Sequence, residues 1–478
     1  MDRMSPLDAM FLHIEDGNTH MHIASCAIFE GPAPAYSDLV ELFAGKLQFV
    51  PRYRQKVRFV PGGVGRPVWV DDPHFRLDYH VRHTALPSGT DEELRRLMGR
   101  LMSQQLDRNR PLWETWMVEG LAGGRWALVS KVHHCMVDGI SGTDLMAVVL
   151  DSSREGSPRA VTEWKPAPEP SDTDLVRDAI AETMSSPNEL ARWGRSILRS
   201  PRRVAGDVNE VVRGALSLGD RLRPNVPLSI EGTIGPHRSW AWARSSLDEV
   251  KAIRAAHGGT VNDVVLTAIT KGFRELLLKH GDPIDGVVVR TLVPVSVRSS
   301  GDHTYNNQVS AMIAELPVGI DDPVERLHSI HAQMAGLKDS HQAVAGNVLV
   351  NLAGFAPPVL LAVGLRTAVG VMRRMPQRSV NTVTTNVPGP QIPLYACGRE
   401  MLEYFPFVPV ASGLRTGVAI LSYNRKIGFG VTGDWDSVPD VGVLAEGIEE
   451  GMRELLAVST PPSPTPPPKR AARTRKVA

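Results

Sequence analysis

The stretch WALVSKVHHCMVDGISG, residues 126–142, decides the fold of this chain. Its first half is apolar at nearly every position, which predicts a β-strand buried on both faces. The strand runs into His133 and His134, Gly139 then breaks the pattern, and residues 144–150 resume it as a helix. Two histidines therefore lie where a strand has ended and a helix has not begun.

A histidine at such a position is held by the strand and can still face a cavity. Its near-neutral pKa suits it to accept a proton from a substrate hydroxyl. A buried core histidine and a metal ligand are the alternatives. Adjacent strand residues point to opposite faces, so His133 and His134 would not easily share an ion. The sequence has no Cys-x-x-Cys or His-Glu-x-x-His pattern to supply further ligands. We therefore expect no metal.

Four further motifs accompany HHCMVDG. PLWE lies upstream at residues 111–114, and VNDVVL (261–266), NVPGP (386–390) and YNRKIGFGVTGD (423–434) follow downstream. HHCMVDG matches the HHxxxDG signature of the CoA-dependent acyltransferase superfamily, which includes chloramphenicol acetyltransferase and the condensation domains. With the other motifs in the expected order, residues 4–458 resemble the bacterial wax ester synthase/diacylglycerol acyltransferase family.

The resemblance implies an α/β fold of two chloramphenicol-acetyltransferase-like domains. Each is a mixed β-sheet flanked by helices, and the active-site channel lies at their interface. We expect the N-terminal domain over residues 1–151 and the C-terminal domain over residues 231–458. Residues 152–230 are expected to form an interdomain linker with basic amphipathic helices, because they open with a Pro/Ser-rich stretch. Residues 459–478 are Pro-rich and basic, which predicts a disordered tail.

The composition is that of an ordinary globular protein. Of 478 residues, 42% are hydrophobic and 22% are charged, and the net charge of +1 gives no reason to expect nucleic-acid binding. Three widely spaced cysteines favour a reducing compartment without disulfides. The N-terminus lacks a signal-peptide pattern, and the most apolar run, residues 359–371, is too short to span a bilayer. We expect a cytoplasmic protein that can touch the inner membrane face or lipid droplets.

By resemblance, His134 is the general base that removes the proton from the acceptor hydroxyl. His133 would pack behind His134 and orient it. A Cys-His-Asp triad with Cys135 as nucleophile is rejected, because the resembled family works without a covalent acyl-enzyme.

The resemblance also implies that Asp138 points away from the cavity and pairs with an arginine. Arg298, at the end of a predicted strand, is our candidate for this structural partner. Gly139 would let the backbone turn closely behind the carboxylate.

Three of the motifs are predicted to contact substrate. The residues are Pro111, Leu112, Trp113, Asn262, Asp263, Asn386, Pro388 and Gly389. For each motif a plain structural interpretation also stays open. PLW can be a rigid turn with a packing tryptophan, Asp263 can cap a helix together with Thr260, and NVPGP predicts an extended turn.

The resemblance implies an O-acyltransferase that moves a long-chain acyl group from acyl-CoA to diacylglycerol, or to a long-chain alcohol, in triacylglycerol or wax ester synthesis. Acyl-CoA is a co-substrate, and we expect no cofactor, since the sequence has neither a P-loop nor a dinucleotide fingerprint. Two alternatives stay open: a polyketide or glycolipid hydroxyl as acceptor, and a non-catalytic lipid-binding member of the family. The intact His134 argues against the second.

Two basic stretches are candidates for contact with a lipid surface. Residues 192–223 hold eight arginines among apolar residues, and residues 469–476 are basic without any acid. The alternative is that the apolar residues of the first stretch pack on the domains. The apolar residues 343–371 can likewise line a lipid channel or fill the core.

Overall fold

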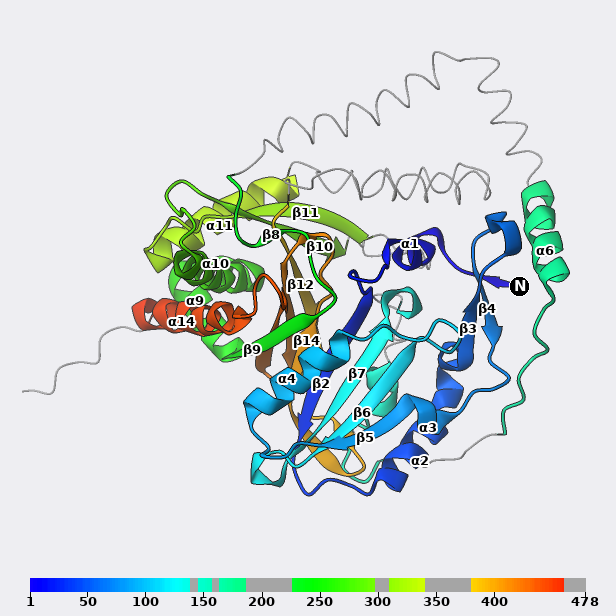
Figure 1. The fold of residues 1–478 in the computed structure, drawn as a ribbon. Helices are drawn as coiled ribbons and strands as arrows, with labels where there is room; N and C mark the ends of the chain where they lie inside the picture. Colours follow the sequence, from blue (N-terminus) through cyan, green and yellow to red (C-terminus); the bar gives the residue numbers. More distant parts are fainter. Residues whose placement is uncertain (138–144, 157–162, 186–225, 297–308, 340–379, 460–478) are drawn as a thin grey trace, which may run out of the picture.

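The computed structural model describes residues 1–137, 145–156, 163–185, 226–296, 309–339 and 380–459. The described chain forms two six-stranded mixed sheets, each flanked by helices (Figure 1). This arrangement confirms the predicted fold class. The predictions for residues 192–223, 343–371 and 469–476 lie outside the described residues.

The first sheet has the strand order β13-β14-β2-β7-β6-β5. The strands are β13 (Tyr395–Ala396), β14 (Arg399–Phe407), β2 (His22–Phe29), β7 (Trp126–His133), β6 (Trp113–Glu119) and β5 (Val81–Ala85). Only the β5–β6 pair is parallel. As predicted, β7 is buried along its whole length, because it lies in the middle of a sheet covered on both faces.

One strand of this sheet comes from the far end of the chain. β14 pairs with β2, although the sequence placed residues 231–458 in a separate C-terminal domain. The predicted boundaries therefore do not separate the two sheets. The choice of a neighbouring strand depends on long-range packing, which a local sequence pattern does not contain.

The second sheet has the order β11-β10-β12-β16-β17-β9. The strands are β11 (Val309–Leu316), β10 (Val289–Ser296), β12 (Thr382–Pro388), β16 (Thr416–Tyr423), β17 (Lys426–Asp434) and β9 (Arg238–Ser246). Helices α9 (Leu247–His257), α10 (Val261–His280), α11 (Pro323–Asp339) and α14 (Val441–Ser459) accompany it. The apolar faces of α9, α10, α11 and α14 join its strands in one buried core.

The remaining elements surround the first sheet, except for one short strand pair beside the core of the second. The helices are α1 (Pro6–Ile14), α2 (Tyr36–Lys46), α3 (Leu77–His80), α4 (Asp91–Met102) and α5 (Leu145–Val149). Short 3-10 turns occur at η1 (Leu47–Phe49), η2 (Pro51–Arg54), η3 (Pro61–Gly63) and η4 (Ala122–Gly124). The short strands are β1 (Asp2–Arg3), β4 (Val68–Asp71) and β3 (Gln55–Arg58), which form a small sheet, and the pair β8 (Glu231–Gly232) and β15 (Gly413–Leu414).

The start of the predicted linker is anchored to the first domain. Helix α6 (Asp172–Ser185) packs Leu175 and Ala179 against valines of the small sheet. Arg3 adds ion pairs to Asp178 at 2.5 Å and to Glu182 at 2.6 Å. Residues 172–185 therefore belong to the folded body of the N-terminal domain.

The two large sheets approach each other very closely where β14 passes β17. A Cβ atom on Gly430 would lie 1.6 Å from the Pro406 carbonyl oxygen, and one on Gly428 would lie 2.4 Å from that of Tyr404. Only glycine leaves room for backbone at these distances. None of the helices in the described ranges has the length and apolar character needed to cross a bilayer.

Candidate active site

The two histidines lie at the end of β7, between β2 and the PLW segment. His133 is the last residue of β7, and His134 opens the short turn η5 (His134–Met136). The His133 N–H donates to the Leu112 carbonyl at 2.9 Å, and the His134 N–H donates to the Met21 carbonyl at 2.8 Å. The backbone of both residues is therefore fixed by neighbouring elements, as expected for residues at a strand end.

The ring of His133 is buried and its tautomer is determined by its partners. Nδ1 accepts the Cys135 N–H at 3.1 Å, so a neutral ring carries its proton on Nε2. Nε2 faces the Glu15 carboxylate, with Oε2 at 3.6 Å. His133 thus packs in the interior as expected, and its role in orienting His134 stays a prediction.

Glu15 is a site residue that the sequence analysis missed. Its carboxylate accepts from Arg108 at 2.5 and 3.0 Å and from the Met21 N–H at 3.3 Å. Burial acts to raise its pKa, but the hydrogen bond and charge of His133, together with Arg108, outweigh burial and lower the pKa to about 2. The carboxylate is therefore ionised throughout the physiological range. A lone acid at the end of an apolar helix gave no local signal of this role.

The ring of His134 lies against α1. It stacks on Phe11 with ring centroids 3.9 Å apart and an interplanar angle of 28°. Burial, with a smaller effect from the charge of His133, lowers the pKa of His134 to about 4, although the ring's contact with its own backbone acts to raise it. His134 is consequently neutral at pH 7 and able to accept a proton. Its Nδ1 is buried and has no other hydrogen-bond partner among the described residues.

Cys135 is poorly suited to be a nucleophile. Its side chain is buried, and burial is the main reason that its pKa lies well above the ordinary value for a thiol. A buried thiol of raised pKa is unreactive. Asp138, Gly139 and Arg298 lie outside the described residues, so their predicted pairing stays a prediction.

The PLW segment packs inward. Leu112 and Trp113 are buried, and the Trp113 indole N–H donates to the Tyr53 carbonyl at 2.8 Å while the ring stacks on His80 at 4.7 Å. Pro111 and Trp113 also border a cavity of about 370 Å³ on the outer side of this segment. Packing in the interior explains why Leu112 and Trp113 are buried. A role of this segment in the acyl channel stays a prediction.

Asp263 has the capping role that the sequence left open. It exchanges hydrogen bonds with Thr260 at 2.8 and 3.3 Å at the start of α10. Its carboxylate also binds Nδ1 of His331 at 2.8 Å. Asn262 is half-buried beside it, and its contact with substrate stays a prediction.

The prediction of a turn over NVPGP is wrong for its first three residues. β12 continues through Asn386 to Pro388 in parallel register with Ile420 to Ser422 of β16. Proline is tolerated there because it is the last residue of the strand. The chain leaves the sheet at Gly389, where a Cβ atom would lie 2.2 Å from the Ser422 carbonyl oxygen. Gly389 is thus required by backbone packing.

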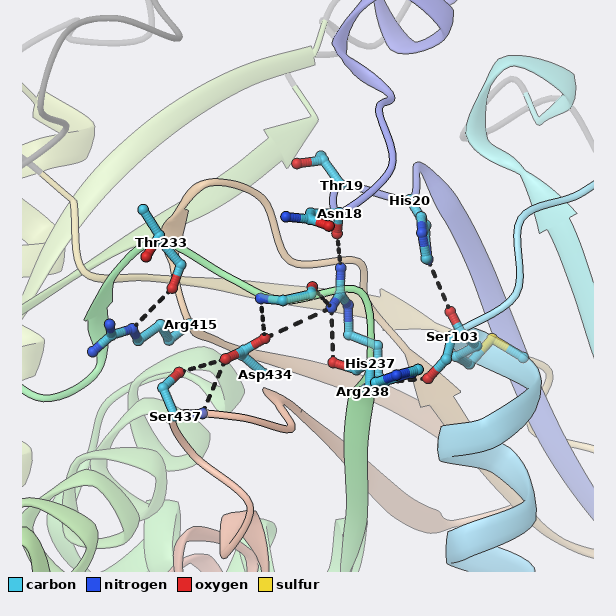
Figure 2. A network of polar contacts seen from close by, with 12 residues as sticks. Asn18, Thr19, His20, Ser103, Thr233, His237, Arg238, Arg415, Asp434 and Ser437 are labelled. Carbon is cyan, nitrogen blue, oxygen red and sulfur yellow. Dashed lines mark hydrogen bonds and ion pairs between the residues drawn. The ribbon is translucent and has the colours of Figure 1, made fainter.

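Figure 2 shows a buried polar network in which Arg238, the first residue of β9, joins the two domains. Its Nη2 donates to the Asn18 carbonyl in the loop between α1 and β2. Its backbone N–H donates to Ser103 Oγ, just after α4, at 2.9 Å. The second domain therefore holds the loop that follows Glu15.

Asp434, at the end of β17, completes this network. Its Oδ1 accepts the Gly235 N–H at 2.7 Å and lies 3.9 Å from Nη1 of Arg238, and its Oδ2 accepts from Ser437. A cavity of about 360 Å³ lies at the same junction, bordered by residues 16–19 of the first domain and by Thr233, Ile234 and Ser412 of the second. The junction thus combines a rigid polar contact with open space.

No cluster of three or more metal-ligating side chains occurs in the described part of the chain. The His134 ring and the polar groups around it lie together at the end of β7. Proton transfer at the end of β7, close to a domain junction, is the reaction step that this geometry favours.

Comparison with known proteins identifies relatives across nearly the whole chain. Residues 4–265 match the family model of the wax ester synthase/diacylglycerol acyltransferase catalytic domain, and residues 305–456 match the WS/DGAT C-terminal domain. A probable diacylglycerol O-acyltransferase of Mycobacterium tuberculosis is 37% identical over 469 residues, which are 96% of each chain. A second, putative diacylglycerol O-acyltransferase of that organism is 32% identical and covers 96% of this chain and 92% of its own.

Two solved structures share the fold. The wax ester synthase/diacylglycerol acyltransferase from Marinobacter aquaeolei VT8 superposes with a TM-score of 0.69 at 23% identity, over 96% of this chain and all of that one. The first condensation domain of the CDA synthetase gives a TM-score of 0.56 at 17% identity, over 95% of this chain and 96% of that one.

Proposed function

The chain belongs to the wax ester synthase/diacylglycerol acyltransferase family, and from this we propose how it transfers an acyl group. It is an O-acyltransferase whose acceptor is diacylglycerol or an alcohol. We propose that acyl-CoA is its donor, that His134 is its general base and that no cofactor takes part. The observation that carries this proposal is the neutral His134 ring at the end of β7.

In the proposed reaction, His134 takes the proton of the acceptor hydroxyl as its oxygen attacks the thioester carbonyl. A tetrahedral intermediate forms, with negative charge on the former carbonyl oxygen. It collapses by breaking the carbon–sulfur bond, and the imidazolium of His134 returns the proton to the departing CoA thiolate. The products are an ester and free CoA, and the enzyme ends in its starting protonation state.

The role proposed for His133 is supporting. Its Nδ1 accepts the Cys135 N–H, and its Nε2 faces the Glu15 carboxylate at 3.6 Å, so the ring is turned towards protein groups. Cys135 takes no covalent part, in agreement with its buried, protonated thiol. This division of roles distinguishes the two adjacent histidines by their partners.

The decisive experiment follows free CoA released from palmitoyl-CoA, with and without diacylglycerol, a fatty alcohol or a monoacylglycerol. His134→Ala should lower the rate roughly a hundred- to ten-thousandfold, the usual contribution of a general base. Cys135→Ala is the matched control and should keep most of the activity. If His134→Ala kept more than about a tenth of the wild-type rate, His134 would not be the base.

We also propose that the enzyme reaches its water-insoluble acceptor by peripheral contact with a membrane or lipid droplet. The basic residues in the stretches 192–223 and 469–476 support this proposal. Binding to anionic liposomes at low salt that weakens in the Arg199→Ala/Arg202→Ala/Arg203→Ala variant is the expected result. No flotation at low salt would refute it.

A further inference from the structure

Two side chains on one side of helix α1 and its C-terminal cap lie against His133 and His134. Phe11 and Glu15 are four residues apart, so their side chains project from the same side of the helix. The Glu15 N–H donates to the Phe11 carbonyl at 3.2 Å and closes the last turn of α1. Phe11 stacks on His134, and Glu15 faces His133. A segment some 120 residues upstream thus supports both rings.

We propose that Phe11 and Glu15 are positioning residues for acyl transfer, which hold the two histidines in their reactive arrangement from outside the HHxxxDG motif. Neither residue is assigned a contact with substrate. The proposal rests on the proposed function in one respect, that His134 is the base.

The Glu15 carboxylate faces His133 directly, and it also binds Met21, the residue that holds the backbone of His134. Oε2 faces the Nε2–H of His133, while Oε1 accepts the N–H of Met21 at 3.3 Å. The Met21 carbonyl in turn accepts the His134 N–H at 2.8 Å. Arg108 donates twice to Oε2 and keeps the carboxylate charged. One buried carboxylate therefore faces the ring of His133 and, through Met21, helps to hold the backbone at His134.

Phe11 acts on His134 in a different way. Its ring covers one face of the imidazole and excludes water from it. Burial is the main reason that the pKa of His134 is lowered to about 4, so removal of this cover should let the pKa rise. The charged groups around η5 are Asp8 of α1, Glu15 at its C-terminal cap, Arg52 of η2 and Arg108, together with His133 itself.

The test compares Phe11→Ala, Phe11→Leu and Glu15→Gln with the control Leu12→Ala. Leu12 is buried in the core on the same helix, so its truncation destabilises α1 but leaves the ring contacts in place. For each full-length variant we would measure kcat and KM with palmitoyl-CoA and diacylglycerol, the acid limb of kcat/KM against pH, and the ring titration of His134 by NMR.

Phe11→Ala should shift the acid limb and the His134 titration upward by about one pH unit and lower kcat roughly tenfold. Phe11→Leu keeps an apolar cover and should shift both by less. Glu15→Gln should lower kcat roughly ten- to a hundredfold with KM changed by less than about twofold, because it disturbs orientation and not binding. Leu12→Ala should lower the melting temperature and leave the acid limb in place.

An unchanged His134 titration in Phe11→Ala, or a Glu15→Gln variant with wild-type kcat, would overturn the proposal. An equal shift of the acid limb in Leu12→Ala would also overturn it, because general destabilisation would then explain the effect. The NMR titration reports on the ring whether or not His134 is the base. Failure of the proposed function appears separately, as activity retained by His134→Ala.

Discussion

His80 is a buried residue whose charge state should govern stability at mildly acidic pH. It is 1% exposed, stacks on Trp113, and shares a 2.7 Å hydrogen bond from Nδ1 with the Trp113 carbonyl. Burial lowers its pKa to about 4, from 6.5 in the unfolded chain, although the hydrogen bond acts to raise it. The unfolded state therefore binds a proton first as pH falls. Stability is complete above pH 6.5 and declines as pH falls towards 4.

We expect this one group to cost about 3 kcal/mol of unfolding free energy at pH 4 and below, relative to pH 7. Urea unfolding between pH 7 and pH 4 would measure the slope, and His80→Phe should make it shallower. His134 contributes in the same direction, so the difference between wild type and variant isolates His80. Equal slopes in the two proteins would show that His80 is not buried in its neutral form.

At this scale the sequence placed the two histidines better than the groups that surround them. The HHxxxDG pattern placed His133 and His134 at a strand end, where the structure has them. No sequence pattern indicated the contacts that Glu15 and Lys131 make. Lys131 is 1% exposed and donates to the Leu101 carbonyl at 2.9 Å, and its place within the strand gives no indication of that partner. Both contacts join segments far apart in the chain, which local patterns do not encode.

The approach of β14 to β17 makes a prediction about an element. Gly430→Ala would place a Cβ atom 1.6 Å from backbone at Pro406, so the two strands must separate. We expect a loss of about 3 kcal/mol in unfolding free energy, at the upper end of the usual cost of overpacking. Urea unfolding would measure it.

Gly442→Ala in α14 is the matched control. Its Cβ atom would meet nothing within 4 Å, and an added alanine in a helix stabilises by up to about 1 kcal/mol. Equal stability of the two variants would mean that the sheets can adjust without cost.

Elements with strong local patterns were predicted well. The strand that ends at His133 forms as predicted, and the capping box between Thr260 and Asp263 forms at the start of α10. The failures have specific causes. β12 continues through Pro388 because proline is tolerated at the last position of a strand in its pairing with β16. β14 joins the first sheet because strand pairing is decided by the whole core.

The crossing of β14 predicts how the whole molecule responds to truncation. A fragment of residues 1–230 lacks β13 and β14 and leaves β2 as a free edge. Cys26 and Ile28 of β2, fully buried in a core that includes Phe405, would become accessible. We expect this fragment to aggregate. A chain of residues 1–459 should keep the thermal transition of the full protein.

Size-exclusion chromatography and thermal circular dichroism would compare the two truncated chains. A soluble, cooperatively melting fragment of residues 1–230 would contradict the prediction, because it would show that the first sheet closes without its crossing strand.

The same crossing has a consequence for the order of events during synthesis. β2 leaves the ribosome early, but its neighbour β14 begins about 370 residues later. At roughly 5–20 residues per second, β2 waits on the order of 20–70 seconds before the strand that covers one of its edges has been made. The first sheet can therefore be completed only when translation is nearly complete. Throughout that interval the nascent chain exposes the free edge of β2, whose backbone groups can pair with another chain. The yield of folded protein should therefore depend on chaperone supply and on the speed of the ribosome.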